Sequence, residues 1–467
     1  MKKYSLPFSA LALLAGLLPA LSGAEEVQPN LGKAADNKIY AQQLVNQLMA
    51  MNSDLLVVGL HAVVPGQKDE TMIATNLDRI GKKDDDDDIA VANEHKTICA
   101  PNLKESNKFE VQVPLKDSKG AWLGASAGFV FKYHTGDDEV ALHVKALKLR
   151  AYLAANTPDL ATLLGPGQAM VPSVWIKIPD SKGKFDFISV DAKRNRVLGA
   201  HEKDGTFDIL DIGSQSILAR LKTGPAVGSA IDPQTGKYFV SIQDDQRVAV
   251  VDPDKLVEVG SIKMDGDTDA IIFDAKDRHV FVTNDNGKFL WVIDGDAQRV
   301  IASIPIPSAP ECMVHDADAD RVYLNLKAAN EVAVIDTKTN TIVALWPTLP
   351  AKGVHGIALD PATGHLFSSG DNKILAELDV KTGKVIGSAD IVAGVDQIAF
   401  DPSTKHVYCM GGGAMTVLDT SGDQLASLGE VRTSDNAKNV AVDPNTHAIW
   451  TTFTDGTNSY AKSFVKP

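Results

Sequence analysis

The chain has 467 residues, a formal net charge of −14 and three cysteines, and its length exceeds what one compact core usually holds, which predicts at least two domains. Such an acidic surface disfavours nucleic acid and anionic membranes as partners, because both carry negative charge. The sequence contains neither CxxC nor CxxCH, which disfavours thioredoxin-like redox chemistry and covalently attached c-type haem.

Residues 1–24, MKKYSLPFSALALLAGLLPALSGA, have the layout of a secretory signal peptide. Lys2 and Lys3 precede a short apolar stretch, and small residues close it at Ala24. No later stretch reaches the roughly 18 continuous apolar residues that a membrane-spanning helix needs, so we expect no stable membrane insertion. We therefore expect an exported protein, either periplasmic or secreted.

Residues 25–165 differ in pattern from the rest of the chain and predict a small α/β domain. Apolar residues at helical spacing occupy 34–52 and 137–155, a strand pattern occupies 54–64, and 108–133 indicates two strands around a turn. This order of elements resembles the extracytoplasmic Cache and PAS modules, and the resemblance implies a sensor-like domain.

Two motifs in this domain imitate functional sites. GASAG at 124–128 matches GxSxG with Ser126 as nucleophile, but the following FVFKY continues a strand where a nucleophile elbow needs a helix, so we expect packing of small strand residues. The five aspartates at 84–88 could gather a cation. Because adjacent carboxylates on one loop repel one another, we expect instead a solvated loop and the N-terminus of a helix at 88–96.

An internal repeat with a period near 42 residues fills the second half of the chain. In each copy a short apolar run ends in an aspartate and a turn, with spacings of 41, 42, 42, 44, 41 and 42. We call these residues the anchor aspartates: Asp191, Asp232, Asp274, Asp316, Asp360, Asp401 and Asp443. Each copy contains four strand-length β-branched or aromatic runs separated by Gly, Asn and Asp turns. Seven such units predict a mainly β fold, a seven-bladed β-propeller over residues 168–467.

The ends of the repeat indicate how the propeller closes. The last unit, residues 436–467, has room for three strands only, while VPSVWIKIP at 171–179 precedes the first full unit and has no partner there. We therefore expect residues 171–179 to be the fourth strand of the last blade, so that no sheet edge stays open.

The segments HVFVTNDNGKFLWVIDGDAQRVIASIPI at 279–306 and GIALDPATG at 356–364 resemble the YVTN-repeat β-propellers of exported bacterial proteins. The resemblance covers about 300 residues. It implies a binding or surface module, because the YVTN signature carries no catalytic residue.

Two further motifs fall inside the repeat. DADAD at 316–320 begins like an EF-hand calcium loop, but Arg321 and Lys327 stand where that loop needs glycine and glutamate, so we expect a turn. Cys312 and Cys409 lie two repeats apart, and the Cys-Met-His order at Cys312 places neighbouring side chains on alternating strand faces. We expect buried structural cysteines at both positions.

The repeat register also picks out one candidate site. The fifth residue before each anchor aspartate lies where the innermost strand of a blade begins, so these positions should ring the mouth of the central channel. Six of the seven are polar, and we predict that they bind a ligand: Asp186, Asp269, Glu311, His355, Asp396 and Lys438. The seventh is Val227. The turns between second and third strands add acids on the same face: Asp244, Asp245, Asp285, Asp371 and Asp455.

Four of the six, Asp269, Glu311, His355 and Asp396, form a possible metal set, since carboxylates suit Ca2+ and an imidazole extends the choice to Zn2+. The alternative is a solvated polar mouth in which His355 and Lys438 balance the acids. Opposite positions across a seven-membered ring could also be too far apart to share one ion.

These patterns favour a non-enzymatic, exported protein that binds an unidentified protein or small molecule at the acidic channel mouth. A metal-dependent hydrolase or lactonase, with its metal at the propeller centre, is the alternative. A quinone- or copper-linked oxidoreductase subunit is a third class, but the sequence supplies none of the expected cofactor ligands.

Overall fold

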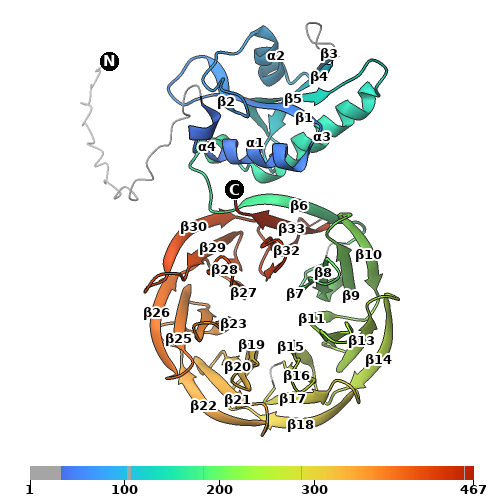
Figure 1. Cartoon of the computed structure of the whole chain (residues 1–467), viewed down its shortest axis with the longest axis vertical. Helices are drawn as coiled ribbons and strands as arrows, with labels where there is room; N and C mark the ends of the chain where they lie inside the picture. The colour runs from blue at the N-terminus through green and yellow to red at the C-terminus, as the bar shows by residue number, and fades with distance from the viewer. Residues whose placement is uncertain (1–32, 102–106, 182, 286, 457) are drawn as a thin grey trace, which may run out of the picture. The chain divides into compact units, whose positions relative to one another are not determined.

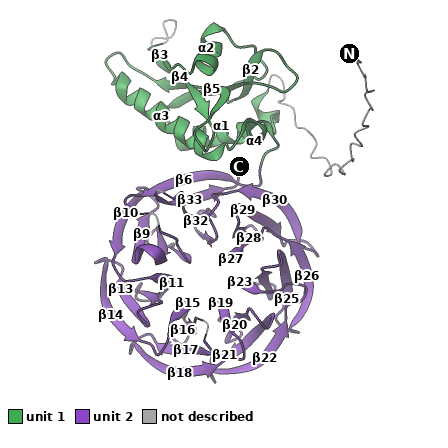
Figure 2. Ribbon diagram, turned by 180° about the vertical axis from the view of Figure 1, so that it is seen from behind, with its two compact units in different colours: residues 1–167 green, residues 168–467 purple. Residues whose placement is uncertain are grey.

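The computed structural model describes residues 33–101, 107–181, 183–285, 287–456 and 458–467, so the expected signal peptide lies outside the described residues. The chain divides into two compact units, Met1–Gly167 and Gln168–Pro467 (Figure 2). Strands dominate the described residues, which confirms the prediction of a mainly β chain. None of the helices described is long and apolar enough to cross a membrane.

The first unit is built on a five-stranded antiparallel sheet with the strand order β2-β1-β5-β4-β3. Its strands are β1 (Leu55–Val63), β2 (Glu70–Thr75), β3 (Ile98–Pro101), β4 (Lys108–Lys116) and β5 (Trp122–Lys132). Its helices are α1 (Tyr40–Met51), α2 (Asp86–Glu94), α3 (Glu139–Asn156) and α4 (Leu160–Leu164), with a 3-10 turn at Ala34–Asp36. Figure 1 shows α1 and α3 on one face of this sheet and α2 on the other.

The alternation of β1 explains how this sheet is covered on both faces. Val58, Leu60 and Ala62 are fully buried, and His61 between them is also buried, with 5 % exposure. Neighbouring residues of a strand point to opposite faces, so β1 has an apolar face and a second buried face that carries a histidine. Ser126 lies inside the continuous strand β5 and pairs with His61 across the sheet, so the expectation of strand packing at GASAG is confirmed.

The run of five aspartates at 84–88 is only partly as expected. Helix α2 begins within the run, and the N-cap Asp85 accepts a hydrogen bond from the backbone N–H of Asp88. Asp85, Asp86 and Asp87 are exposed, but Asp84 is buried and Asp88 is half-buried. The expectation of a fully solvated loop is therefore wrong, because the chain turns at Asp84 and directs two of the five side chains inward.

The second unit consists of seven four-stranded antiparallel sheets among the described residues, arranged around a centre (Figure 1). The strands of the first three sheets are β7 (Ile188–Asp191), β8 (Arg196–His201), β9 (Thr206–Asp211) and β10 (Ser216–Leu221); β11 (Ala226–Ile231), β12 (Tyr238–Ile242), β13 (Arg247–Asp252) and β14 (Val257–Lys263); β15 (Thr268–Asp274), β16 (His279–Asn284), β17 (Phe289–Asp294) and β18 (Arg299–Pro305). A short 3-10 turn, Glu202–Asp204, joins β8 to β9.

The next three sheets follow the same pattern. Their strands are β19 (Pro310–Asp316), β20 (Arg321–Leu326), β21 (Glu331–Asp336) and β22 (Thr341–Pro347); β23 (Val354–Asp360), β24 (His365–Gly370), β25 (Ile374–Asp379) and β26 (Lys384–Asp390); β27 (Val395–Asp401), β28 (His406–Gly411), β29 (Ala414–Asp419) and β30 (Ala426–Arg432).

The last sheet joins the two ends of the unit. It contains β31 (Ala441–Val442), β32 (Ile449–Thr454), β33 (Ser459–Val465) and β6 (Val171–Ile178). Strand β33 pairs with β6 from Ser459 opposite Ile178 to Val465 opposite Val171. The fourth strand of the last sheet thus comes from the segment that the sequence analysis assigned to this place.

The anchor aspartates hold the turns and tie neighbouring sheets together. The carboxylate of Asp232 accepts hydrogen bonds from the backbone N–H groups of Gln234 and Thr235 in its own turn. It also pairs with Arg278 of the next sheet at 2.8 Å. Each anchor aspartate is at most 8 % exposed, so it satisfies turn N–H groups inside the protein. DADAD follows this rule, because Asp316 accepts from the backbone N–H of Ala319, and the expected turn is confirmed. Cys312 and Cys409 are buried and free, also as expected.

Candidate functional site at the channel mouth

The six predicted site residues, which we call the channel-mouth ring, begin the innermost strands. Asp269, Glu311, His355 and Asp396 are each the second residue of β15, β19, β23 and β27. Asp186 and Lys438 come shortly before β7 and β31. The first strands of successive sheets contact one another, and Figure 1 shows them around the centre.

A one-residue register shift occurs at the ring position in five consecutive sheets. In the third sheet Thr268 pairs with Asn284, but Ile271 pairs with Val282, so three steps along β15 match two along β16. The same shift occurs in the second, fourth, fifth and sixth sheets. An extra residue of this kind is a β-bulge, which bends the strand and re-aims a side chain. Strict strand alternation, which the sequence analysis assumed, therefore does not hold at the ring.

Part of the ring is neutralised by its own neighbours. His355 Nδ1 lies 3.2 Å from Glu311 Oε2, and His355 Nε2 lies 3.3 Å from Asp371 Oδ1 in the β24–β25 turn. Lys327 Nζ lies 3.4 Å from Glu311 Oε1. Burial lowers the pKa of His355, but the hydrogen bond and charge of Glu311 outweigh it, so the pKa of the imidazole is raised overall. These contacts favour a charged His355 that is already paired.

A second pair lies in the next two sheets of the ring. Lys438 Nζ is 3.2 Å from Asp396 Oδ2. The alternative in which His355 and Lys438 balance some of the acids therefore describes this part of the mouth.

The remaining two carboxylates are not balanced in this way. Burial raises the pKa of Asp269 well above its usual range, and the charges of Asp186 and Glu311 add to the rise. Burial raises the pKa of Asp186 to about 7 against the opposing charge of Lys184, while Asp396 and Glu311 raise it further. No ion pair of the described residues joins Asp269 to a lysine or arginine. Asp186 and Asp269 thus form an acidic sector of the ring.

Cys312 shows how closely the ring converges. Its Sγ lies 3.5 Å from the backbone oxygen of Asp396, although the two residues belong to the fourth and sixth sheets. Burial raises the pKa of this thiol well above its usual range, and the four ring carboxylates add to the rise. The side chain of Cys312 is therefore buried against the backbone of a ring residue two sheets away.

The predicted metal set is not gathered into one site. Among the residues that the structure describes, Asp269, Glu311, His355 and Asp396 do not bring three ligand atoms within 4.8 Å of one another. The only described group that meets this distance is His61, Asp84 and Asp88, in the first unit. A shared repeat position therefore does not bring the ligand atoms of these four residues together.

Sequence reasoning missed a bridging residue below the ring. Gln397 Oε1 accepts hydrogen bonds from the backbone N–H groups of Ile188 and Val440, and its Nε2 donates to the backbone oxygen of Ile188. The side chain thus links the sixth, seventh and first sheets across the channel. Its signal was available one place after the ring position, where Gln397 stands beside Asp396 and five of the other repeats have small or apolar residues, the last repeat having Asn439.

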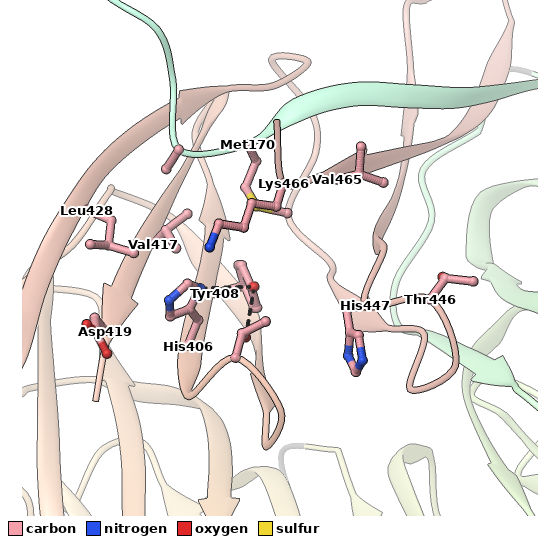
Figure 3. Close-up of a pocket in the computed structure, with 12 residues that line it drawn as sticks. Met170, His406, Tyr408, Val417, Asp419, Leu428, Thr446, His447, Val465 and Lys466 are labelled. Carbon is pink, nitrogen blue, oxygen red and sulfur yellow. Dashed lines mark hydrogen bonds between the residues drawn. The ribbon is translucent and has the colours of Figure 1, made fainter. Parts of the chain in front are cut away.

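A pocket of about 700 Å³ lies on the opposite face of the propeller, between the sixth and last sheets (Figure 3). Thr404 lines it from the β27–β28 turn, His406 from the start of β28, and His447 from the β31–β32 turn. These turns join first and second strands, so they lie at the end of the sheets away from the ring. The pocket was not predicted, because its residues come from different repeat positions.

Comparison with known proteins supports the fold. No protein-family model and no curated protein matches this sequence. Among solved structures, hydrazine synthase from Kuenenia stuttgartiensis is 15 % identical with a TM-score of 0.53, and the match covers 62 % of this chain and 96 % of that one. The structure of U3-55K is 9 % identical with a TM-score of 0.55, covering 62 % and 98 %. The WD40 repeats of RRP9 are 8 % identical with a TM-score of 0.55, covering 63 % and 100 %. The chain therefore contains a β-propeller similar in fold to these structures, and the predicted propeller is confirmed.

Proposed function

We propose that this protein is an exported, non-enzymatic interaction protein that binds a positively charged segment of a partner protein at its channel mouth. The observation that carries the proposal is the acidic sector formed by Asp186 and Asp269. Both carboxylates are half-buried and neither forms an ion pair with a described lysine or arginine. This costs free energy in the folded protein, and such groups often mark a binding surface. A lysine or arginine from a partner would supply the missing positive charge.

The division of the ring supports a protein partner over a single small ion. The Glu311–His355 group and the Asp396–Lys438 pair flank the acidic sector with polar groups that are already satisfied. An interface of this kind combines one site of charge complementarity with a polar rim. The propeller likeness to WD40 repeats is compatible with protein interaction as the general role.

The finer assignments belong to the same proposal. We take the seven sheets as the blades of a YVTN-type propeller, closed by residues 171–178, because the repeat spacing and the β33–β6 pairing agree. Residues 1–24 would direct export, and the first unit would be a sensor-like domain of the Cache or PAS type. Its five-stranded antiparallel sheet with helices on both faces supports this view.

Binding of a labelled hexalysine peptide, followed by fluorescence anisotropy, tests the proposal. The double variant Asp186→Asn with Asp269→Asn should weaken binding about tenfold, which corresponds to about 1.4 kcal/mol. The matched control is Asp318→Asn with Asp423→Asn, which makes the same two substitutions in exposed turns at the opposite end of the sheets. Equal weakening in both double variants would show that only net charge attracts the peptide and would refute the assignment of the site.

A further inference from the structure

A second group of ligand-type side chains is buried inside the first unit. His61 Nδ1 lies 2.7 Å from Asp84 Oδ1 and 4.0 Å from Asp88 Oδ2. One ligand atom from each of the three residues lies within 4.8 Å of the other two. The group joins β1 to the start of α2, two elements that are separated in sequence but face each other.

The backbone fixes the positions of these residues. His61 points from β1 to the face that α2 covers, and Gly59 leaves room for its ring, since a Cβ there would lie 2.9 Å from His61 Nε2. The backbone N–H of Asp84 donates to the backbone oxygen of Glu70 at 3.2 Å, which ties the start of the aspartate run to β2. Asp88 belongs to the first turn of α2. The group therefore rests on a sheet and a helix.

Two buried carboxylate oxygens, one in this group and one beside it, lack a hydrogen-bond partner. Asp84 Oδ2 is one, although Asp84 is only 8 % exposed, and Glu70 Oε1 is the other, although Glu70 is only 6 % exposed. Buried polar atoms in folded proteins nearly always have a partner, and an orphaned one calls for an explanation such as a bound ion. Here both orphaned oxygens belong to residues around His61.

The charges of the group also favour a bound cation. No described lysine or arginine forms an ion pair with Glu70, Asp84 or Asp88. Two buried carboxylates and the half-buried carboxylate of Asp88 therefore share a single imidazole, and a divalent cation would balance two of their charges.

We infer that His61, Asp84 and Asp88 bind a divalent first-row transition metal, with Glu70 as a further oxygen ligand. Carboxylates alone would suit Ca2+ or Mg2+, but the imidazole at the centre of the group favours Zn2+, Mn2+ or Fe2+. Gln112 Nε2 donates to Asp88 Oδ1 at 3.1 Å and leaves Asp88 Oδ2 directed at His61. Such outer hydrogen bonds commonly orient metal ligands.

The buried position indicates a structural role for the metal. It would hold α2 against β1 and β2 in the first unit, and binding would stabilise that unit by mass action. This inference does not rest on the function proposed for the propeller, because none of the ligands belongs to the channel-mouth ring.

The test is calorimetric titration of chelator-treated, dialysed protein with Zn2+, Mn2+ and Ca2+, with elemental analysis after desalting. We expect one equivalent of Zn2+ or Mn2+ and at least tenfold weaker binding of Ca2+. Asp88→Asn should weaken Zn2+ binding at least tenfold. Asp87→Asn makes the same change one residue earlier, at an exposed position, and should bind like the wild type. Circular dichroism checks that both variants are folded.

X-ray absorption of the zinc-loaded wild-type protein keeps the test independent of any variant. We expect nitrogen and oxygen donors at about 2.0–2.2 Å and no sulfur. Absence of stoichiometric binding, equal binding of Ca2+, or equal loss in Asp87→Asn and Asp88→Asn would overturn the inference. Loss of zinc in Asp269→Asn but not in Asp88→Asn would also overturn it, and would place the metal in the propeller instead.

Discussion

Replacing Asp186 by asparagine should stabilise the propeller at pH 8 and leave its stability nearly unchanged at pH 4. Burial raises the pKa of Asp186 to about 7 in the folded protein, whereas an aspartate in an unfolded chain titrates near 3.9. Between these values the folded state binds more protons than the unfolded state. The free energy of unfolding therefore falls as the pH rises from about 4 to about 7.

The size of this effect follows from the pKa difference. About three units correspond to about 4 kcal/mol as an upper bound, and relaxation around a partly buried group reduces the expected gain to about 2 kcal/mol. Asparagine resembles the protonated carboxyl group, so Asp186→Asn should recover this free energy at pH 8 but gain little at pH 4.

Urea unfolding followed by tryptophan fluorescence measures the gain. Four of the five tryptophans lie in residues 168–467, so the signal reports mainly on the propeller: Trp175, Trp291, Trp346 and Trp450. Asp318→Asn, at an exposed turn, should show no gain at either pH. A variant of Asp186 that is no more stable than the wild type at pH 8, or that gains equally at both pH values, would refute the account of the acidic sector.

Three further predictions concern the framework that holds the ring. Arg278→Met leaves Asp232 buried without its partner and should lower the free energy of unfolding by about 3 kcal/mol at pH 7, measured by urea unfolding. The pairing lowers the pKa of Asp232 to about 2 despite burial. The loss of stability should therefore shrink as the pH falls from about 4 towards 2. Gln397→Ala removes three hydrogen bonds across the channel and should lower the free energy of unfolding by about 2 kcal/mol, whereas a mobile, solvated glutamine would give no change. Burial lowers the pKa of Lys462 to about 7, so the unfolded state binds more protons between about 7 and 10.4 and stability should rise with pH across that window. Lys462→Met should therefore raise the melting temperature more at pH 7 than at pH 10, while the exposed Lys177→Met should not.

The sequence predicted the propeller because its signal is repeated. One aspartate and one turn recur at a nearly constant interval, and each copy supports the interpretation of the others. The structure explains the recurrence, since a buried carboxylate such as Asp232 holds its own turn and also contacts the next sheet. Substitution of a residue with both roles would disturb its own turn and its contact with the next sheet, which explains why the aspartate recurs in every copy.

The pairings within the ring could not be predicted in the same way. Glu311 meets His355, and Asp396 meets Lys438, because neighbouring innermost strands lie side by side at the mouth. The repeat register shows that these residues are equivalent in position. It does not show the distances between sheets, and these distances decide which charges pair and which do not.

The metal group in the first unit was missed for a different reason. The five aspartates at 84–88 were treated as adjacent charges on one loop, but a helix that starts inside the run separates their directions. Asp84 and Asp88 turn inward, while Asp86 and Asp87 stay in solvent. The third member, His61, lies 23 residues earlier on a strand, and no local pattern connects it to the run.

The seven copies also show that the ring position is free to vary. Five consecutive sheets have the same register shift at this position, yet the residue there is Val227, Asp269, Glu311, His355 or Asp396. One backbone geometry therefore accepts an apolar, an acidic and an imidazole side chain without rearrangement. The anchor aspartate five residues later performs the structural task in every copy. Because the anchor aspartate and the ring residue are different residues of the same strand, the charge of the channel mouth can change without loss of the propeller, and variants such as Asp269→Asn can test the proposed binding separately from folding.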